Sequence, residues 1–478
     1  MPFRNILFSR LFLTAVIISL FFGGINRSLL RFVDDTYHAH LSKLIITSGS
    51  IFKIPHPWNS RSFYLEKTTF LPWLMSLGQR IFPTQTIGPK FFLIINIILC
   101  LFLMFCILKD LFSEEYAWLS VFILSTTQLF LWYARRAGFD ASIVCYIMLS
   151  ILCYYAADKR RLYSLGCGFF AGLAVLTKGV MGLWPPFIIC VWLLASGQTR
   201  KIFSRETLLA VISFSACALP WHIIMYTVHG KDFLEIYLWQ YQIAYFFEKS
   251  QLVNWGKLDN LKKLAENYWP YLPLLLYSLG QGINKCVRKE TGKKEKDWIL
   301  LLLIWILSFF IIFQIAHTKR YYFTLPAYAG MALLSAWYLL QIAWHRKAVK
   351  ALAVLAALAS IALWTTPLSV YLDQSGHAWQ KHKALFDFLV SKPKMAEDLY
   401  IFPQRRDLNM WLYDGFIAHT EYNIINGIFE QELKTIITNK QADLIFTEEK
   451  YLTAPEIKTL AESGSEIFRS NGLLLFFR

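Results

Sequence analysis

Long apolar runs recur along this chain and limit what it can fold into more than any other feature. An α-helix rises 1.5 Å per residue, so about 20 apolar residues cross the roughly 30 Å hydrocarbon core of a bilayer. The chain is 56% hydrophobic and 17% charged, whereas soluble domains are about 25% charged. We therefore predict a polytopic α-helical membrane protein with about 11 transmembrane helices. The predicted spans lie near residues 6–25, 90–109, 116–133, 139–157, 162–176, 180–196, 206–226, 268–284, 298–315, 322–341 and 348–365.

Basic residues collect in alternate loops between these runs. The chain has 48 Lys and Arg against 32 Asp and Glu. When successive loops are assigned to alternate faces, residues 158–161, 284–297 and 345–350 share one face. The positive-inside rule makes that face cytoplasmic. We expect a multi-pass protein of the plasma (inner) membrane, with its N-terminus in the cytoplasm and its C-terminus outside. The excess charge then reports topology, and we expect no nucleic-acid partner.

The opposite face carries cations that the positive-inside rule disfavours. Three of its loops are short, 134–140, 177–179 and 317–322. Snorkelling or contact with lipid headgroups would explain any one of these cations. Five on one face favour a binding site for an anion. The five are Arg135, Arg136, Lys178, Lys319 and Arg320.

An acid pair follows the first apolar run, in the stretch VDDTYHAH at residues 33–40. Asp34 and Asp35 could mark the start of a solvated loop, or cap a helix beginning near Tyr37. A cap needs only one Asp, however. The alternative is a general base or a metal ligand at the membrane surface, because two close carboxylates have their pKa values split apart.

Two further outer segments have amphipathic character. The stretch FYLEKTTFLPWLMSLGQRIF (63–82) places Glu66 and Lys67 at the start of an expected interfacial helix. Glu66 would either complement the helix dipole or serve as another acid of a site, with Lys67 attracting phosphate. The aromatic segment 231–248 could form a lid over a site at the membrane face.

The chain changes character after residue 365. Residues 378–392 are helix-like, and strand-like stretches such as DLYIF (398–402) follow. We predict a transmembrane domain over 1–365 and a small extracytoplasmic α/β domain over 366–478. The main extracytoplasmic loops of the first domain are expected at 26–89 and 227–267.

These motifs together resemble a known family. VDDTYHAHLSKLIITSGS and the stretch 63–82 resemble the first outer loop of the GT-C membrane glycosyltransferases, in the group of dolichyl-phosphate-mannose protein mannosyltransferases and aminoarabinose transferases. ARRAGFDA (134–141), GLAVLTKGVMGLWP (172–185), ALPWHIIM (218–225) and HTKRYYFTLPAYAGMAL (317–333) are similar to further family segments in the same order. The resemblance extends over about residues 6 to 345. A small α/β domain at the end also fits the aminoarabinose transferases.

The resemblance implies an enzyme that moves a sugar from a polyprenyl-phosphate carrier to an acceptor outside the cytoplasm, with inversion. Lipid A, a protein and a glycan all stay open as the acceptor. Asp34 matches the catalytic acid position of the family, beside Asp35. The implied donor phosphate site comprises Lys67, Arg135, Arg136, Lys178, Lys319, Arg320 and Tyr321, with Tyr64, Glu66 and Asp140 as further site candidates.

The chain departs from the family at two motifs. EKTT stands where the family has Glu-Lys-Pro-Pro. A His that joins the Glu in metal binding in the aminoarabinose branch is replaced near Tyr241. A divalent metal at Glu66 is the one cofactor that the resemblance leaves open, and the change at Tyr241 weighs against it.

Transport of a lipid-linked substrate, by a transporter or flippase, is the alternative function. Transporters place polar sites near the bilayer midplane, often in paired repeats. Here the charges gather at one face, and the two halves of the chain show no repeat. The sequence therefore favours the transferase.

Overall fold

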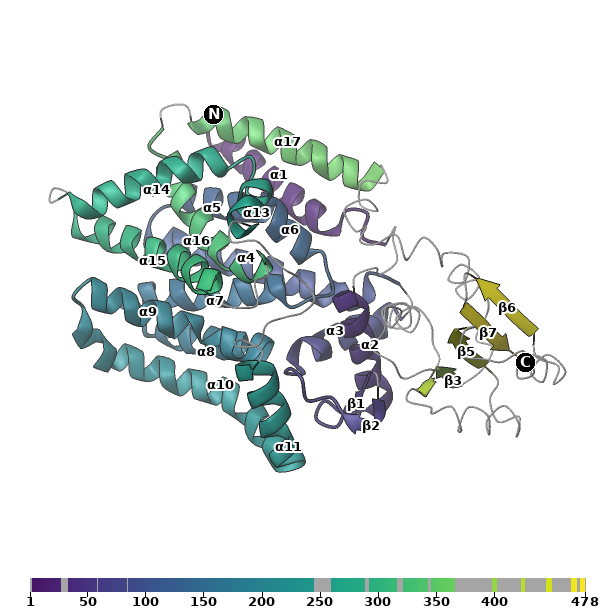
Figure 1. Cartoon of the computed structure of the whole chain (residues 1–478). Helices are drawn as coiled ribbons and strands as arrows, with labels where there is room; N and C mark the ends of the chain where they lie inside the picture. The colour runs from purple at the N-terminus through teal and green to yellow at the C-terminus, as the bar shows by residue number, and fades with distance from the viewer. Residues whose placement is uncertain are drawn as a thin grey trace. The chain divides into compact units, whose positions relative to one another are not determined.

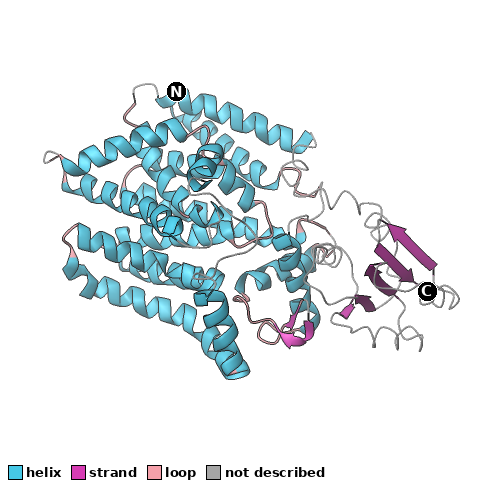
Figure 2. Cartoon of the chain, in the orientation of Figure 1, coloured by secondary structure: helices cyan, strands magenta, loops and turns pink. Residues whose placement is uncertain are grey.

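The computed structural model describes residues 2–26, 33–57, 59–83, 85–244, 259–288, 292–315, 321–342 and 345–365, together with five strands after residue 397. The chain divides into two compact units. Unit 1 comprises Met1–Gly23, Glu66–Phe70 and Leu93–Thr366, and unit 2 comprises Gly24–Leu65, Leu71–Phe92 and Pro367–Arg478. The described part of unit 1 is helical (Figure 1), whereas unit 2 combines helices with two small sheets (Figure 2).

Unit 1 is built from long apolar helices joined by short connections. Each of the eleven predicted spans overlaps one of its helices or a pair of them. The helices are α1 (Pro2–Phe22), α4 (Gly88–Leu111, entering from unit 2), α5 (Glu114–Thr126), α6 (Gln128–Ala134), α7 (Asp140–Ala156), α8 (Arg161–Lys178), η1 (Gly179–Leu183), α9 (Trp184–Ala195), η2 (Thr199–Phe203), α10 (Arg205–His229), α11 (Lys231–Phe233), η3 (Leu234–Ala244), α13 (Asp259–Asn267), α14 (Leu272–Val287), α15 (Lys293–Ile315), η4 (Tyr321–Thr324), α16 (Ala327–Leu339) and α17 (His345–Thr365).

Four helical stretches in the described part of the chain are long and apolar enough to cross a membrane. They are Gly88–Leu111, Arg161–Ala195, Arg205–His229 and Lys293–Ile315, and the bent pair α5–α6 would make a fifth. The second stretch turns back at Gly179, where φ is +53°, and an added Cβ at Gly182 would lie 2.2 Å from the backbone nitrogen of Val175. The helical membrane class is confirmed, and the number eleven stays a prediction.

The predicted span 116–133 is not one straight helix. α5 and α6 meet at an angle of 72°. Thr127 between them has extended backbone, with φ −65° and ψ 124°. The carbonyl of Ile123 accepts hydrogen bonds from both the backbone N–H of Thr127, at 3.0 Å, and its hydroxyl, at 2.7 Å, so the side chain adds a second hydrogen bond at the bend.

α7 is the central helix of unit 1. All of its residues except Asp140 and Tyr155 are buried, as expected for a helix that is apolar on every side. α8 packs against α7 and also against α10 (Figure 1). Small residues bring α8 and α10 together, because an added Cβ at Gly168 would lie only 1.9 Å from the carbonyl oxygen of Ala210. Close approach of this kind is typical of membrane helix pairs.

The first helix of unit 2 corrects the predicted start of the outer loop. α2 runs over Val33–Ser48 and ends at Gly49, where φ is +64°. The helix was expected near Tyr37, but Asp34 and Asp35 already lie in its first turn. Carboxylates there are favoured by the helix dipole. The interpretation of the pair as a cap for a helix beginning near Tyr37 is therefore wrong, because both acids lie inside the helix.

The second predicted outer helix also starts later than expected. α3 covers Phe70–Ile81 and carries Pro72 in its first turn, where a backbone N–H is not needed for helical hydrogen bonding. Glu66 and Lys67 therefore lie in the segment before the helix, and the helix-dipole interpretation of Glu66 is wrong. α3 joins α2 through a hydrogen bond of 2.5 Å between the Ser42 hydroxyl and Gln79 Oε1.

Unit 2 contains two sheets. β1 (Pro55–His56) and β2 (Asn59–Phe63) pair antiparallel. The larger sheet has the order β4-β3-β5-β7-β6. β3 is parallel to β4 and β5, and β7 is antiparallel to β5 and β6. Its strands are β3 (Asp398–Ile401), β4 (Asn423–Ile425), β5 (Leu444–Glu448), β6 (Glu466–Ser470) and β7 (Leu473–Phe477). Parallel neighbours require crossover connections, and the predicted helix 378–392 lies outside the described residues.

Replacing Gly168 with Val should separate α8 from α10, because the new side chain would meet the Ala210 carbonyl. We expect the free energy of unfolding to fall by about 1–3 kcal/mol, measured as detergent-induced unfolding of the purified protein. Gly280→Val on α14 is the matched control, since an added Cβ there meets no atom within 4 Å. Equal losses in both variants would contradict the close packing.

Candidate active site

Glu66 and Lys67 lie in a short segment that is fixed to the helices of unit 1. The hydroxyl of Thr68 donates a hydrogen bond to the carbonyl of Leu176 in α8. Trp221 in α10 donates its indole N–H to the hydroxyl of Thr69, at 2.9 Å. Thr68 and Thr69 are buried, whereas Glu66 and Lys67 are half-buried. The two threonines therefore hold the acid and the lysine at the ends of α8 and α10.

A salt bridge joins the adjacent ends of α7 and α8. Lys178 Nζ lies 2.5 Å from Asp140 Oδ1, and each side chain is only 16% exposed. Asp140 is the first residue of α7 and Lys178 is the last residue of α8, so each charge complements the dipole of its own helix. Lys178 Nζ also lies 5.5 Å from the ring centroid of Tyr322, within the range of a cation–π interaction.

The segment η3 connects this pair to Glu66. The Tyr241 hydroxyl donates a hydrogen bond of 2.7 Å to Glu66 Oε1. Its neighbour Gln242 accepts a hydrogen bond of 2.9 Å from the backbone N–H of Val180, two residues after Lys178. On the other side, Lys67 Nζ lies 5.6 Å from the ring of Phe139, next to Asp140. These contacts close on themselves, and we call their members the polar ring: Glu66, Lys67, Phe139, Asp140, Lys178, Val180, Tyr241 and Gln242.

The beginning of η3 is held by an aromatic cluster. Tyr237 stacks on Phe233 with ring centroids 4.9 Å apart, and its hydroxyl lies 3.2 Å from His222 Nε2 in α10. Burial raises the pKa of Tyr237, so its hydroxyl stays protonated at neutral pH. Leu238 and Trp239 on the other side of the segment are exposed. The predicted amphipathic segment 231–248 is described only as far as Ala244, and its exposed side carries apolar as well as polar residues.

The two arginines of ARRAGFD have different surroundings. Arg135 is buried, and its guanidinium donates hydrogen bonds to the carbonyls of Leu20 (2.5 Å) and Gly23 (2.6 Å) at the end of α1. It thus satisfies carbonyls that a helix end leaves without intrahelical partners. Arg136 is also buried, with its guanidinium 5.2 Å from the rings of Trp132 and Tyr133.

Three predicted site residues belong to unit 2. Asp34 is exposed, whereas Asp35 beside it is only 2% exposed. Tyr64 is buried in the core of this unit, where it packs with Tyr37, Leu41, Ile45 and Ile54. The two acids therefore lie in the first turn of α2. The later turns of this helix pack against Tyr64, two residues before Glu66.

Some of the site could not be read from the sequence, and some lies beyond the described residues. Lys319 and Arg320 fall outside the described residues, while Tyr321 in η4 is half-buried. Gln242 and the two threonines Thr68 and Thr69 were not predicted. The available signal was the Gly after Lys178, which marks a turn whose N–H groups need acceptors.

The residues present do not fit a metal at Glu66. No group of three His, Cys, Asp or Glu side chains converges within the described part of the chain, and zinc needs three or four such ligands. Glu66 Oε1 accepts the hydrogen bond of Tyr241, and the phenol keeps its proton to make that bond. Glu66 and Tyr241 stand at the two positions where the resemblance implies metal ligands, and here a hydrogen bond joins them directly.

Comparisons with known proteins agree with this architecture. The family model described as dolichyl-phosphate-mannose-protein mannosyltransferase matches residues 66–224. An undecaprenyl phosphate-alpha-4-amino-4-deoxy-L-arabinose arabinosyl transferase of Edwardsiella ictaluri (strain 93-146) is 27% identical over 318 residues, which is 64% of this chain and 54% of that protein. The chain thus matches about half the length of this relative.

Solved structures extend the similarity to the whole fold. The crystal structure of ArnT from Cupriavidus metallidurans bound to undecaprenyl phosphate superposes with a TM-score of 0.72 at 14% identity, covering 98% of this chain and 97% of that one. An Archaeoglobus fulgidus oligosaccharyltransferase in complex with Zn and sulfate has a TM-score of 0.52 at 16% identity, covering 98% and 73%.

The helical bundle, with charged segments gathered at the ends of its helices, is therefore a membrane protein of the GT-C fold. Within this class the chain is similar to the mannosyltransferase family model over residues 66–224 and to the aminoarabinose transferases, as the loop motifs indicated.

A double-mutant cycle should show that the Lys178–Asp140 pair is strongly coupled. With both side chains mostly buried, we expect a coupling free energy of about 1–3 kcal/mol between Lys178→Ala and Asp140→Ala, measured by unfolding. Lys201 and Asp158 form a pair of the same residue types and the same 2.5 Å distance, but with side chains 37% and 67% exposed. Its coupling should stay below about 1 kcal/mol. Equal couplings would show that burial does not strengthen the pair.

Proposed function

We propose that this protein is an inverting glycosyltransferase that moves a sugar from a polyprenyl-phosphate carrier to an acceptor on the extracytoplasmic face of the plasma membrane. The observation that carries the proposal is the polar ring, in which Lys67, Asp140 and Lys178 lie together inside the stretch matched by the mannosyltransferase family model. The named activity of the Edwardsiella relative and the undecaprenyl phosphate in the ArnT structure support it.

Lys67 is proposed as the first contact of the donor phosphate. It is half-buried, and no carboxylate forms an ion pair with it among the described residues, whereas Asp140 already compensates Lys178. A cation without a counter-charge in a partly buried place favours an anionic ligand. Further stabilisation of the departing phosphate would come from Arg136, Lys319, Arg320 and Tyr321. Arg135 acts indirectly, by fixing the end of α1.

Asp34 is proposed as the general base. Its exposed position allows it to meet an acceptor, and the buried Asp35 lies beside it in the same helical turn. Asp34 would take the proton of the acceptor hydroxyl as that oxygen bonds to the anomeric carbon. The bond from the anomeric carbon to the phosphate oxygen breaks, and its electron pair leaves with polyprenyl phosphate. Attack from the opposite side inverts the anomeric configuration.

The segment η3 is proposed as the cover of the donor site. Tyr241 and Gln242 fasten its end to Glu66 and Val180, and its exposed face carries Leu238 and Trp239. Such a segment excludes water from a reaction at the membrane surface. The remaining proposals follow the sequence: a cytoplasmic N-terminus, a transmembrane domain over 1–365, an extracytoplasmic domain over 366–478, and lipid A, a protein or a glycan as acceptor.

Mass spectrometry of envelope fractions from cells with and without the protein tests the proposed function. Lipid, protein and glycan fractions are analysed separately. We expect one fraction to lose a mass the size of a pentose or hexose derivative, which identifies sugar and acceptor class together. If every fraction is unchanged and a polyprenyl-phosphate sugar instead redistributes across the membrane, the protein is a transporter.

The role of Asp34 is tested by Asp34→Asn in the same cells. Because the amide cannot take up the acceptor proton, we expect the transfer rate to fall by 10²-fold or more, at the low end of what general-base catalysis contributes. Asp232→Asn, at an exposed acid of α11, is the control and should keep full activity. Expression of each variant is followed by immunoblot. Normal transfer by a well-expressed Asp34→Asn protein would remove this residue from the mechanism.

A further inference from the structure

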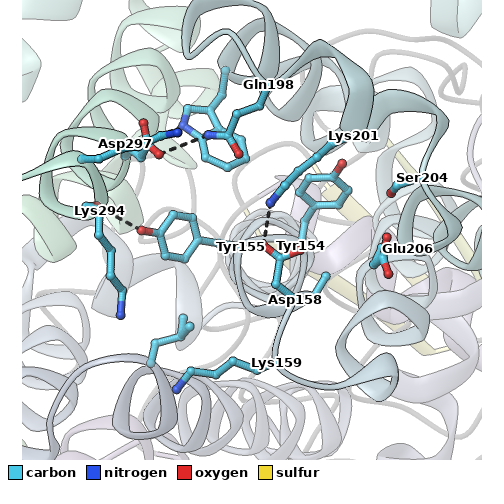
Figure 3. Close-up of a pocket in the computed structure, with 14 residues that line it drawn as sticks. Tyr154, Tyr155, Asp158, Lys159, Gln198, Lys201, Ser204, Glu206, Lys294 and Asp297 are labelled. Carbon is cyan, nitrogen blue, oxygen red and sulfur yellow. Dashed lines mark hydrogen bonds and ion pairs between the residues drawn. The ribbon is translucent and has the colours of Figure 1, made fainter.

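A second polar feature of unit 1 lies at the other end of α7. A cavity of about 430 Å³ opens where the C-terminal ends of α4, α7 and α9 meet the first turns of α10 and α15 (Figure 3). Tyr154, Tyr155 and Asp158 line it from the end of α7, which begins at Asp140 of the polar ring. The helix has 17 residues, so the two sites are about 25 Å apart along its axis. This volume is within the usual range of ligand sites.

Four lysines line the cavity: Lys159, Lys201, Lys293 and Lys294. The first two are compensated, because Lys159 contacts Asp110 and Lys201 Nζ lies 2.5 Å from Asp158 Oδ2. Lys293 and Lys294 form no ion pair with any of the residues that the structure describes. They sit in the first turn of α15, where the helix dipole opposes positive charge. Two cations without an ion-pair partner among the described residues therefore line the cavity, and Lys294 Nζ lies 5.8 Å from the ring of Phe112.

The acids of the lining are already engaged. Asp297 Oδ2 accepts a hydrogen bond of 3.2 Å from Gln198 Nε2. Glu206 lies in the first turn of α10, where its charge is favoured by the helix dipole. Asp158 is paired with Lys201. None of the three forms an ion pair within 4 Å with Lys293 or Lys294, although the charges of Asp297 and Lys293 interact at longer range. With four lysines against three acids, the lining keeps a net positive charge.

Hydrogen bonds hold the aromatic wall of the cavity in place. Tyr155 donates a hydrogen bond from its hydroxyl to the carbonyl of Lys294 at 3.3 Å (Figure 3). Trp192 donates its indole N–H to the carbonyl of Asp297 at 3.0 Å. Both bonds fix the first turn of α15 against α7 and α9. The backbone that carries Lys293 and Lys294 is therefore positioned before any ligand arrives, which lowers the entropic cost of binding.

Exposed apolar side chains stand close in sequence to residues that line the cavity. Phe203, between the lining residues Lys201 and Ser204, is 91% exposed. Leu194 and Leu208 near the same helix ends are also exposed. Side chains of this kind contact acyl chains rather than water. The combination of a basic cavity with adjacent apolar surface matches a lipid better than a free anion.

We infer that the cavity binds the phosphate headgroup of an anionic membrane phospholipid, with Lys293 and Lys294 contacting the phosphate and the acyl chains lying over Phe203 and the ends of α9 and α10. Basic pockets between helices on the cytoplasmic side are suited to such headgroups, and the positive-inside rule places this end of α7 there. The inference does not depend on the proposed transferase activity.

Lipid binding is tested with the purified full-length chain in nanodiscs of phosphatidylglycerol or of phosphatidylcholine. We expect the unfolding midpoint to be higher in phosphatidylglycerol, and native mass spectrometry to show a retained phosphatidylglycerol molecule. Lys293→Ala/Lys294→Ala should weaken this binding at least tenfold. The control Arg200→Ala/Arg205→Ala removes two exposed cations of the same region that do not line the cavity, and it should bind as the wild type does.

Other results would overturn the inference. Equal losses in the two double variants would show a general charge effect of this face. Full binding by Lys293→Ala/Lys294→Ala would exclude the cavity. If inorganic phosphate, added to the phosphatidylcholine nanodiscs, raises the midpoint as much as phosphatidylglycerol does, the ligand is a free anion. Lys293→Arg/Lys294→Arg keeps the charge and should restore binding, which separates loss of the site from misfolding.

Discussion

A chain inside a bilayer has to satisfy its own backbone groups, because hydrocarbon offers no hydrogen-bond partners. This constraint explains why side chains take over where the helices of unit 1 end or bend. At the bend between α5 and α6, the hydroxyl of Thr127 adds a second hydrogen bond to the carbonyl of Ile123, which also accepts the backbone N–H of Thr127. At the end of α1, the guanidinium of Arg135 serves the carbonyls of Leu20 and Gly23. Polar side chains at the helix ends of unit 1 thus satisfy backbone carbonyls, and the candidate site residues lie at such ends too.

The polar ring shows how such ends become a site. Burying Asp140 and Lys178 costs several kcal/mol of hydration for each ion, and their short contact offsets that cost only while both are present. Lys67 has no such partner among the described residues. Two opposite unit charges 4 Å apart attract each other by about 4 kcal/mol at an effective dielectric constant of 20. In the proposed donor site Lys67 would therefore attract the anion, and the Asp140–Lys178 pair beside it serves mainly to hold α7 against α8.

Much of the fold was predictable because hydrophobic length and charge bias are local properties of the sequence. The apolar runs located the helices, and the glycines after Lys178 and Ser48 marked real helix ends. The bend at Thr127 was not predicted, although the polar stretch STTQ at 125–128 interrupts the apolar run there. Contacts between distant segments were hidden as well. Nothing near Glu66 in the sequence shows that Tyr241, 175 residues later, donates a hydrogen bond to it, and the use of Arg135 as a cap for α1 depends on tertiary packing alone.

The two ends of α7 also explain how the chain can keep cations on both faces. Arg135, Arg136 and Lys178 on the predicted outer face weaken the charge bias that orients a membrane protein. The cost is reduced because Arg135 donates hydrogen bonds to carbonyls and Lys178 is paired with Asp140, so these two cations add little free charge at that end. At the opposite end, Lys293 and Lys294 stay uncompensated by the described residues. Positive charge that is free to meet anionic lipid there restores the bias, and the same lysines that orient the helices would then also hold α15 at the membrane surface.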